Sequence, residues 1–452
     1  MERVRDVSEL PKAHLHLHFT GSMRPTTLLE LADKHGVRLP ETLTEALGRG
    51  ESPKLRATDE RGWFRFQRLY DAARSCLQTP EDIQRLVREA AEEDLRDGSG
   101  WLEIQVDPTS YAPRLGGLIP ALEIILDAVE TTVRDTGIGM RVLVAANRMK
   151  HPLDARTLAR LAVRYAERGV VGFGLSNDER RGMARDFDRA FAIARDGGLL
   201  SAPHGGELTG PASVRDCLDD LEADRIGHGV RAAEDPRLLK RLADRQVTCE
   251  VCPASNVALG VYEKPEDVPL RRLFEAGVPM ALGADDPLLF GSRLAAQYEI
   301  AREHHGFTDA ELAELARQSV RGSAAPEEVK GSCWRGWTTG LWRRCPVGGS
   351  GSRRGVSVLG TARNRSLEKA RGVDAPTAAG GHPPTRPLLA VRGSPAHAPR
   401  PAPRRTRLPR RSCGQSCRWG GTGGRSGTPQ RRAASPSRPH PPGCPGNAGR
   451  AI

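Results

Sequence analysis

Short apolar segments of strand length recur through the first 290 residues of the chain. Most intervals between them carry apolar residues at helical spacing, as in residues 153–169 and 235–246. Eight strands that alternate with helices predict an α/β fold, the parallel (β/α)8 or TIM barrel. The long first interval, residues 20–100, is mostly helical in pattern, and we expect it to form an excursion over the barrel mouth. The predicted strands lie at residues 12–19, 101–106, 141–146, 170–175, 199–203, 225–230, 247–252 and 279–284.

Three histidines alternate along the first predicted strand. Residues two apart share one face of a strand, whereas on a helix they would diverge by about 200°. His16 and His18 can therefore point at one ion only if this segment is a strand, and we expect His14 on the same face, one layer deeper. Taken alone, the alternation is equally typical of polar residues on a half-buried strand.

Other ionisable residues stand where later apolar runs end. His204 ends one such run, and the two glycines that follow let the backbone turn, so that Glu207 can reach the same pocket. His228 and the pair Asp285 and Asp286 also follow apolar runs. Taken alone, the segment HGGE could also be a glycine turn that exposes an acid, which is the weaker interpretation. Together, these residues lie at predicted strand ends, which is where TIM barrels carry their active sites.

The residue types point to metal chemistry. Imidazole nitrogens and carboxylate oxygens are normal zinc ligands, and a catalytic site keeps one position open for water. Zinc lowers the pKa of bound water from about 16 to about 7, so hydroxide is available at neutral pH. The segments therefore predict a zinc hydrolase or deaminase.

Five segments resemble the adenosine deaminase family of zinc-dependent amidohydrolases. The resemblance extends from about residue 10 to about residue 330, with the motifs in the family's order. It implies a TIM-barrel enzyme that deaminates an aminopurine, with a purine nucleoside as its small-molecule partner. The segments are HLHLHFTGSMRPTTLLELA from residue 14, APHGGELTGP from 202, DRIGHGV from 224, CPASNVALG from 252 and ALGADDP from 281.

The resemblance also implies roles for individual residues. Glu207 would donate a proton to the purine ring, His228 would lie beside the activated water, and Asp286 would contact the five-membered ring. The implied catalytic residues are Glu207, His228 and Asp285. The implied ligands of one Zn²⁺ per chain are His16, His18, His204 and Asp285.

These roles fit together in one reaction. Hydroxide would attack C6 of the aminopurine while Asp285 and His228 accept and relay the water's proton. Protonated Glu207 would donate to N1, which makes the ring carbon electrophilic, and ammonia would leave. Because Glu207 must carry a proton near neutral pH, its pKa must be raised, and burial against a stacked purine favours that.

Several positions depart from the family pattern on the nucleoside side. Thr20 stands where the family usually has an acid that contacts the sugar, and Gln105 stands where an arginine is common. The family's DLAGDE reads GLSNDE here, so Gly174 and Asn177 replace an Asp and a Gly, although the backbone N–H of Asn177 can still reach purine N3. We expect adenosine and 2'-deoxyadenosine as substrates, with adenine or another 6-aminopurine nucleoside as the alternative. The expected substrate contacts are His18, Thr20, Asn177 and Asp286.

Charge divides sharply along the chain. The whole sequence has 68 Lys and Arg against 56 Asp and Glu, a net charge of +12. Residues 331–452 contain 23 basic and 2 acidic residues, which leaves 45 basic and 54 acidic residues in 1–330. The C-terminal segment is rich in Arg, Gly and Pro and has no apolar period with which to bury a core. We therefore expect a catalytic barrel domain over residues 1–330 and a low-complexity basic tail over 331–452.

Three interpretations of the tail compete. It is a solvated disordered extension, a nucleic-acid-binding segment, or the product of a shifted reading frame. We favour the frame shift because the sequence changes character after Lys330, inside an expected closing helix, and four of the six tryptophans follow. Nucleic-acid binding is the weakest of the three.

The cysteines and the amino terminus bear on the location of the protein. The CxxC pair Cys249 and Cys252 would point to opposite faces of a strand, so we expect core packing rather than a thiol pair. No basic segment followed by an apolar run opens the chain, and no stretch of about 18 apolar residues occurs. We expect a cytoplasmic enzyme that does not insert into membranes. The oligomeric state stays open, and a barrel that keeps the site only for binding is the non-enzymatic alternative.

Overall fold

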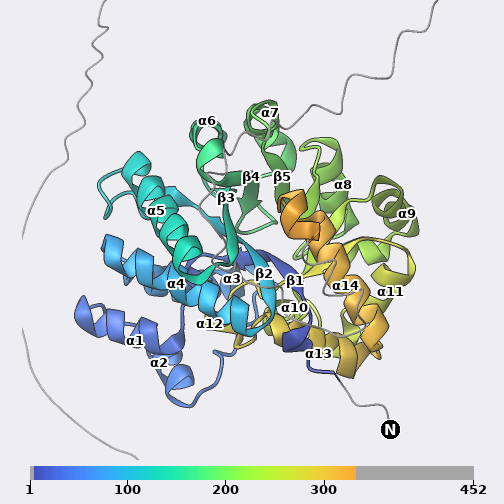
Figure 1. The fold of residues 1–452 in the computed structure, drawn as a ribbon, viewed down its shortest axis with the longest axis horizontal. Coiled ribbons are helices and arrows are strands. Elements are labelled where there is room, and N and C mark those ends of the chain that lie inside the picture. Colours follow the sequence, from blue (N-terminus) through green and yellow to red (C-terminus); the bar gives the residue numbers. More distant parts are fainter. Residues whose placement is uncertain (1–4, 332–452) are drawn as a thin grey trace, which may run out of the picture. The chain divides into compact units, whose positions relative to one another are not determined.

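The computed structural model describes residues 5–331, which form the predicted barrel (Figure 1). Eight strands lie in one sheet in chain order, and each neighbouring pair from β1 to β8 is parallel. All eight strands predicted from the apolar segments are present. They are β1 (Lys12–His18), β2 (Ser99–Val106), β3 (Gly139–Asn147), β4 (Val170–Ser176), β5 (Leu200–Gly205), β6 (Arg225–His228), β7 (Thr248–Val251) and β8 (Met280–Leu282).

Helices cover the outside of the strands, as Figure 1 shows. The α-helices are α1 (Pro25–Lys34), α2 (Glu41–Gly48), α3 (Glu60–Ser75), α4 (Pro80–Arg96), α5 (Leu118–Thr136), α6 (Pro152–Arg164), α7 (Asp188–Asp196), α8 (Pro211–Asp219), α9 (Pro236–Arg245), α10 (Pro253–Ala258), α11 (Leu270–Glu275), α12 (Pro287–Phe290), α13 (Leu294–His305) and α14 (Asp309–Gly322). Short 3₁₀ helices are η1 (Val7–Glu9), η2 (Thr20–Ser22), η3 (Pro108–Ser110), η4 (Ala166–Arg168), η5 (Ala184–Phe187), η6 (Val230–Glu234) and η7 (Pro265–Asp267).

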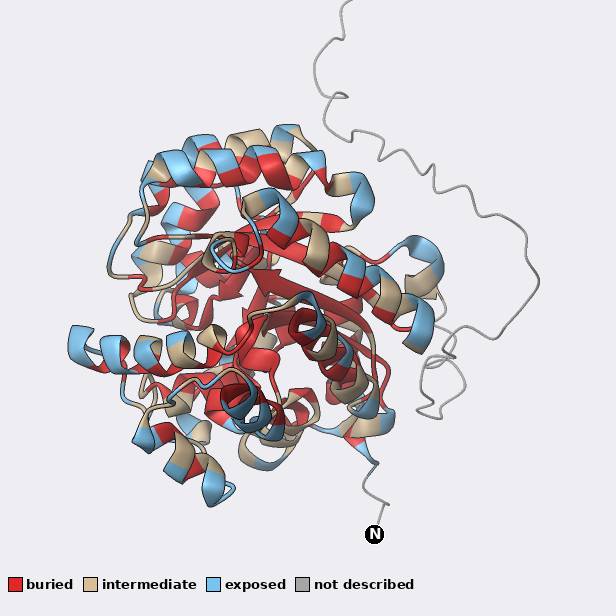
Figure 2. Ribbon diagram, turned by 90° about the vertical axis from the view of Figure 1, so that its left-hand side faces the viewer, coloured by how far each residue is buried: buried red, intermediate tan, exposed pale blue. Residues whose placement is uncertain are grey.

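The strands are buried along nearly their whole length, which Figure 2 shows as a red centre inside half-exposed helices. Every residue of β6, β7 and β8 is buried. This is the pattern of a parallel sheet whose two faces are both covered, and it explains why the strands read as continuous apolar runs.

Backbone hydrogen bonds close the barrel where the last strand meets the first. The N–H of His18 donates to the carbonyl of Asp285 over 2.9 Å, and the N–H of Asp285 donates to the carbonyl of His16 over 3.0 Å. Because these bonds join the end of β1 to the segment after β8, the carboxylate of Asp285 is held beside the histidines of β1.

The excursion between β1 and β2 is helical, as predicted, and consists of α1 to α4. Asp59 caps α3, and Thr79 with Asp82 forms a capping box at the start of α4. The α4 helix packs against β2 and α5, so it takes the place of the first barrel helix. The α3 helix instead contributes side chains to the pocket at the barrel mouth.

One sequence prediction about β1 is wrong. His14 does not share a face with the other two histidines, because the pairing of β1 with β2 shifts register between His14 and Leu17. The ring of His14 instead contacts Asp94 of α4, with Nδ1 2.9 Å from the carboxylate. His14 is therefore no part of the pocket.

Two further predictions concern regions or properties beyond the barrel. Those made for the tail, residues 331–452, lie almost wholly outside the described residues, so the predicted domain boundary stays a prediction. Within residues 5–331, no helix combines the length and the apolar character needed to cross a membrane.

Candidate active site

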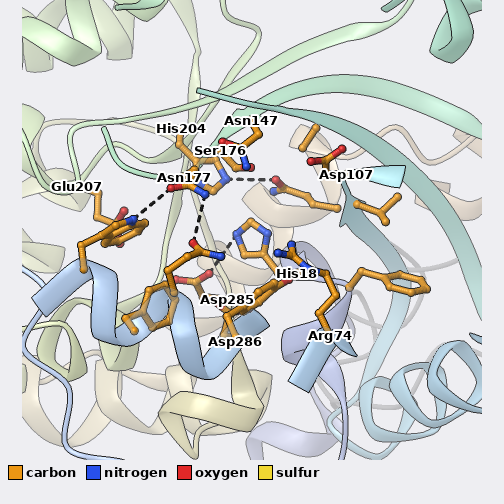
Figure 3. A pocket seen from close by; sticks show the side chains of 18 of the residues that line it. His18, Arg74, Asp107, Asn147, Ser176, Asn177, His204, Glu207, Asp285 and Asp286 are labelled. Carbon is orange, nitrogen blue, oxygen red and sulfur yellow. Dashed lines mark hydrogen bonds and ion pairs between the residues drawn. The ribbon is translucent and has the colours of Figure 1, made fainter. Parts of the chain in front are cut away.

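One pocket at the carboxyl ends of the strands contains most of the predicted site residues (Figure 3). We call the side chains of His16, His18, His204 and Asp285 the floor of this pocket. We call Trp63, Phe66 and Tyr70 of α3 its roof. The predicted residues that line the pocket are His18, Asn177, His204, Glu207, His228, Asp285 and Asp286. His16 is fully buried.

The floor brings together donor atoms from β1, β5 and the end of β8. One ring nitrogen from each of His16, His18 and His204 lies within 4.8 Å of the other two. The Oδ1 atom of Asp285 lies 3.2 Å from Nε2 of His18 and 3.8 Å from Nε2 of His16. The three imidazoles and the carboxylate predicted from distant segments therefore converge on one point.

These spacings fit a bound metal ion. Donor atoms that bind one Zn²⁺ at about 2.0–2.2 Å lie about 3–4 Å from one another, also where a further position stays open for water. In addition, Nε2 of His16 is buried and has no hydrogen-bond partner among the described residues. A buried nitrogen without a partner is costly unless something else binds it, and a metal ion in the floor would do so.

Backbone features make room for the floor. A side chain at Gly227 of β6 would place its Cβ only 2.6 Å from the ring of His204 and 2.9 Å from that of His16. Two of the predicted site residues, His228 and Asp285, adopt positive φ angles of 63° and 62°. This conformation is unfavourable for residues with a Cβ, and such outliers concentrate at functional sites.

A buried chain of charged groups holds His16 from behind. Its Nδ1 lies 2.8 Å from the carboxylate of Glu250, which pairs through its other oxygen with Nε of Arg225 over 2.8 Å. Arg225 also donates to Glu103 of β2 over 2.6 Å. Burial opposes ionisation of Glu250, but Arg225 and His16 lower its pKa below the usual range. Because the carboxylate of Glu250 engages Nδ1 of His16, Nε2 is the nitrogen that remains available as a metal ligand.

Other neighbours orient the remaining floor residues. The hydroxyl of Ser255 donates to Oδ2 of Asp285 over 2.6 Å, and Gln105 lies 3.2 Å from Nε2 of His204. Burial opposes ionisation of Asp285, but the hydrogen bond from His18 and the nearby imidazoles hold its pKa below the usual range. Sequence analysis missed Glu250 and Ser255. An acid in the middle of the apolar run 247–252 was the available signal for Glu250.

Glu207 and His228 form a pair above the floor, with Oε2 of Glu207 3.5 Å from Nε2 of His228. Burial raises the pKa of Glu207 well above its usual value, and the negative charges of Asp285 and Glu179 raise it further. Burial and the nearby His16 lower the pKa of His228 to about 3. The raised pKa favours the protonated form of Glu207 and the lowered pKa favours the neutral form of His228, so the pair combines a group that can donate a proton with one that can accept it.

Asp286 is buried beside the floor. Its Oδ1 has no hydrogen-bond partner among residues 5–331, and Gly21 approaches so closely that an added Cβ would lie 1.8 Å from that oxygen. Burial and the charge of Asp285 raise the pKa of Asp286 to about 8. Asp286 lines the pocket and its buried Oδ1 lacks a partner, so the carboxyl group is suited to bind a polar atom of a ligand.

The roof is tied to the strand ends by Asn177, which has a positive φ of 82°. Its Oδ1 accepts a hydrogen bond from the indole N–H of Trp63 over 3.1 Å, and its Nδ2 donates to Gln67 over 3.2 Å. Thr20, also singled out from the sequence, is not part of the pocket lining. Its hydroxyl is hydrogen-bonded over 2.6 Å to that of Tyr111, which does line the pocket.

Cys252 lies closer to the floor than the sequence indicated. Its sulfur and donor atoms of His16, His228 and Asp285 lie within 4.8 Å of one another. The residue is the N-cap of α10 rather than part of β7, so the strand argument about opposite faces does not apply to it. Burial raises the pKa of the Cys252 thiol well above its usual value, so it contributes a neutral group to the floor's surroundings.

Residues 11–334 match the family model described as adenosine deaminase. The chain belongs to the adenosine deaminase family. A relative from Streptomyces coelicolor that is named adenosine/adenine deaminase is 99% identical over 336 residues, which cover 74% of this chain and 98% of the relative. An adenine deaminase from Rhizobium meliloti is 38% identical over 324 residues, 72% of this chain and 97% of the relative.

The solved structures agree with the fold. The crystal structure of an adenine deaminase from Arthrobacter aurescens is similar with a TM-score of 0.67 at 29% identity, and the match covers 73% of this chain and 98% of that one. The predicted resemblance to the adenosine deaminase family is thus confirmed, and so is the predicted TIM barrel. This family member is a deaminase of the hydrolase class.

Proposed function

We propose that this adenosine deaminase family member hydrolyses adenine to hypoxanthine and ammonia with the help of one zinc ion. Sequence analysis placed adenosine before adenine as the expected substrate, and we reverse that order. The observation that carries the reversal is the pair of hydrogen bonds by which Asn177 holds α3 over the pocket.

The floor would hold the metal. His16, His18 and His204 supply nitrogen ligands, and Asp285 supplies the oxygen ligand. The convergence of their donor atoms and the partnerless Nε2 of His16 support this assignment. When bound there, zinc supplies an activated water at neutral pH.

The residues around the floor would move the protons. Glu207, kept protonated by burial, would donate to N1 of the purine, which draws electrons from C6. Neutral His228 would take the water's proton, with Asp285 as a second acceptor. His18 and Asp286 would contact the bound ring, Asp286 at the five-membered part, and the backbone N–H of Asn177 would meet purine N3. The α3 helix, which covers the pocket, would keep bulk water from the reacting carbon.

Two departures from the family pattern support the free base over the nucleoside. At Thr20 the family usually has an acid for the sugar, and here the hydroxyl is engaged with Tyr111. At Asn177 the family has glycine, and here the side chain is engaged with Trp63 and Gln67. Side chains on the nucleoside side of the pocket thus form hydrogen bonds within the protein instead of with a sugar. The names of the Rhizobium meliloti and Arthrobacter aurescens relatives agree with this preference.

Ammonia release from a zinc-loaded preparation tests the proposal, with adenine, adenosine, 2'-deoxyadenosine and AMP as substrates. We expect kcat/KM for adenine to exceed that for each nucleoside by at least about tenfold, which corresponds to about 1.4 kcal/mol of discrimination. A higher kcat/KM for adenosine would restore the order given by sequence analysis. Metal binding without turnover of any of the four would favour the binding-only barrel.

A further inference from the structure

The proposed proton donor lies on a segment without regular secondary structure. Residues 206–210 connect β5 to α8, and Glu207 is the second residue of this segment. Successive backbone N–H groups in such a turn need acceptors when they are buried. The position of Glu207 therefore depends on whatever satisfies these N–H groups.

A single carboxylate satisfies them. Glu179, in the loop after β4, accepts hydrogen bonds from the backbone N–H of Glu207 over 3.0 Å, of Leu208 over 2.6 Å and of Thr209 over 2.9 Å. It also accepts hydrogen bonds from the N–H of Gly206 and from the hydroxyl of Ser213 in α8. Five donors thus converge on the two oxygens of one buried side chain.

An ionised carboxylate is the only ordinary side chain that can do this. Both of its oxygens accept and neither donates, whereas a glutamine offers one accepting oxygen and an NH₂ group that would face donors. Hydrogen bonds from N–H groups to a charged acceptor are also about twice as strong as those between neutral groups. The arrangement therefore requires a negative charge at Glu179 and not merely a side chain of its size.

The same loop connects the donor to the roof. Asn177, two residues before Glu179, holds Trp63 and Gln67 of α3. One short segment therefore holds the roof at one end and the backbone of Glu207 at the other. In addition, the charge of Glu179 acts with burial to raise the pKa of Glu207.

We propose that Glu179 is a positioning residue for deamination, whose carboxylate fixes the 206–209 turn so that Glu207 points at the substrate ring. The inference rests on the proposed role of Glu207 as proton donor. Glu179 itself does not line the pocket, so it acts on the reaction through Glu207 and not by touching the substrate.

The test uses the full-length, zinc-loaded protein and compares Glu179→Gln with the wild type on the best of the four purines. A displacement of about 1 Å in a reacting group costs about 10²-fold in rate. We therefore expect kcat to fall about 10²-fold while KM changes by less than about threefold and the zinc content is unchanged. Glu179→Asp keeps the charge, and we expect it to recover part of the lost kcat.

Asp178→Asn is the matched control. Asp178 is the adjacent buried carboxylate, but it pairs with Arg180 rather than with the turn. We expect this variant to lower thermal stability without the fall in kcat. If Glu179→Gln does not fold, Ser213→Ala removes one of the five donors, and we expect a fall in kcat of about threefold to tenfold.

The outcomes separate this inference from the proposed function. A merely structural Glu179 predicts a lower melting temperature with kcat within about twofold of the wild type, and that result would overturn the inference while wild-type turnover stands. Wild-type protein that turns over none of the four purines would refute the proposed function and this inference together. A large fall in both kcat and zinc content would assign Glu179 to metal binding and also refute the inference.

Discussion

The floor and the roof of the pocket are built in different ways. The floor consists of side chains at the ends of barrel strands, whose positions follow from the backbone hydrogen bonds of the sheet. The roof consists of side chains from α3, a helix of the excursion, and hydrogen bonds from Asn177 hold it. In the proposed function the floor holds the metal ion, whereas the roof limits how much of a ligand fits. The two parts should therefore respond differently to substitution.

The largest expected effect is that of Glu207→Gln, which keeps the shape of the proposed proton donor and removes its acidity. This substitution should separate proton transfer from metal binding. We expect kcat on adenine to fall by about 10²–10⁴-fold, because general acid catalysis contributes about that much. Zinc content, measured by atomic absorption, should stay at the wild-type level. Near-normal turnover would refute the role of Glu207 as the proton donor.

Breaking the charged chain behind His16 should affect metal binding. Glu250→Gln leaves Nδ1 of His16 without its carboxylate, and such changes typically weaken metal binding 10- to 100-fold. Competition with a chelator measures the zinc affinity. Glu311→Gln is the control, since Glu311 pairs with Arg271 away from the pocket, and it should bind zinc as the wild type does. Equal zinc affinity for Glu250→Gln and the wild type would contradict the role of this chain.

Alkaline pH should act on Glu207, above the floor, and leave the selectivity of the roof unchanged. The pKa of Glu207 is raised, and its protonated form is the active one, so activity persists at pH values where an ordinary glutamic acid has ionised. As pH rises through the raised pKa, kcat/KM should fall about tenfold per pH unit. The ratio of adenine to adenosine turnover should stay constant over the same range. A change in that ratio with pH would show that the selectivity of the roof depends on the protonation of Glu207.

The smallest expected effect is a change of substrate preference. Asn177→Gly restores the family's usual residue, tolerates the positive φ and removes both hydrogen bonds to α3. Each bond contributes about 0.5–1.5 kcal/mol, so we expect the preference for adenine over adenosine to fall about tenfold. The metal content and the pH profile of this variant should equal those of the wild type. An unchanged preference would show that the roof does not select the substrate.

The contrast between floor and roof also explains what the sequence could predict. The ends of apolar runs carry the four floor residues, His16, His18, His204 and Asp285. Because strand ends meet in a barrel, short motifs were enough to predict that these residues lie close together. The acid inside the apolar run 247–252 was a signal for Glu250, but its contact with His16 and that of Ser255 with Asp285 depend on how distant segments pack.

The roof left no comparable signal. Trp63 sits within an amphipathic helix whose periodicity says nothing about where it docks. His14 was misplaced for a related reason, since a register shift in β1 breaks the simple alternation that the prediction assumed.

The hydrogen bonds between Asp285 and the two histidines of β1 have a consequence for assembly of the protein. The proposed metal ligands include residues from the first strand and from the segment after the last one. A bound ion would therefore strengthen the contact between β1 and β8, the one neighbouring pair of strands that no βα connection links. Metal that binds only the closed ring adds about 2.7 kcal/mol of folding free energy at 100 times its dissociation constant. Removal of the metal should thus lower the stability of the whole barrel as well as abolish its activity.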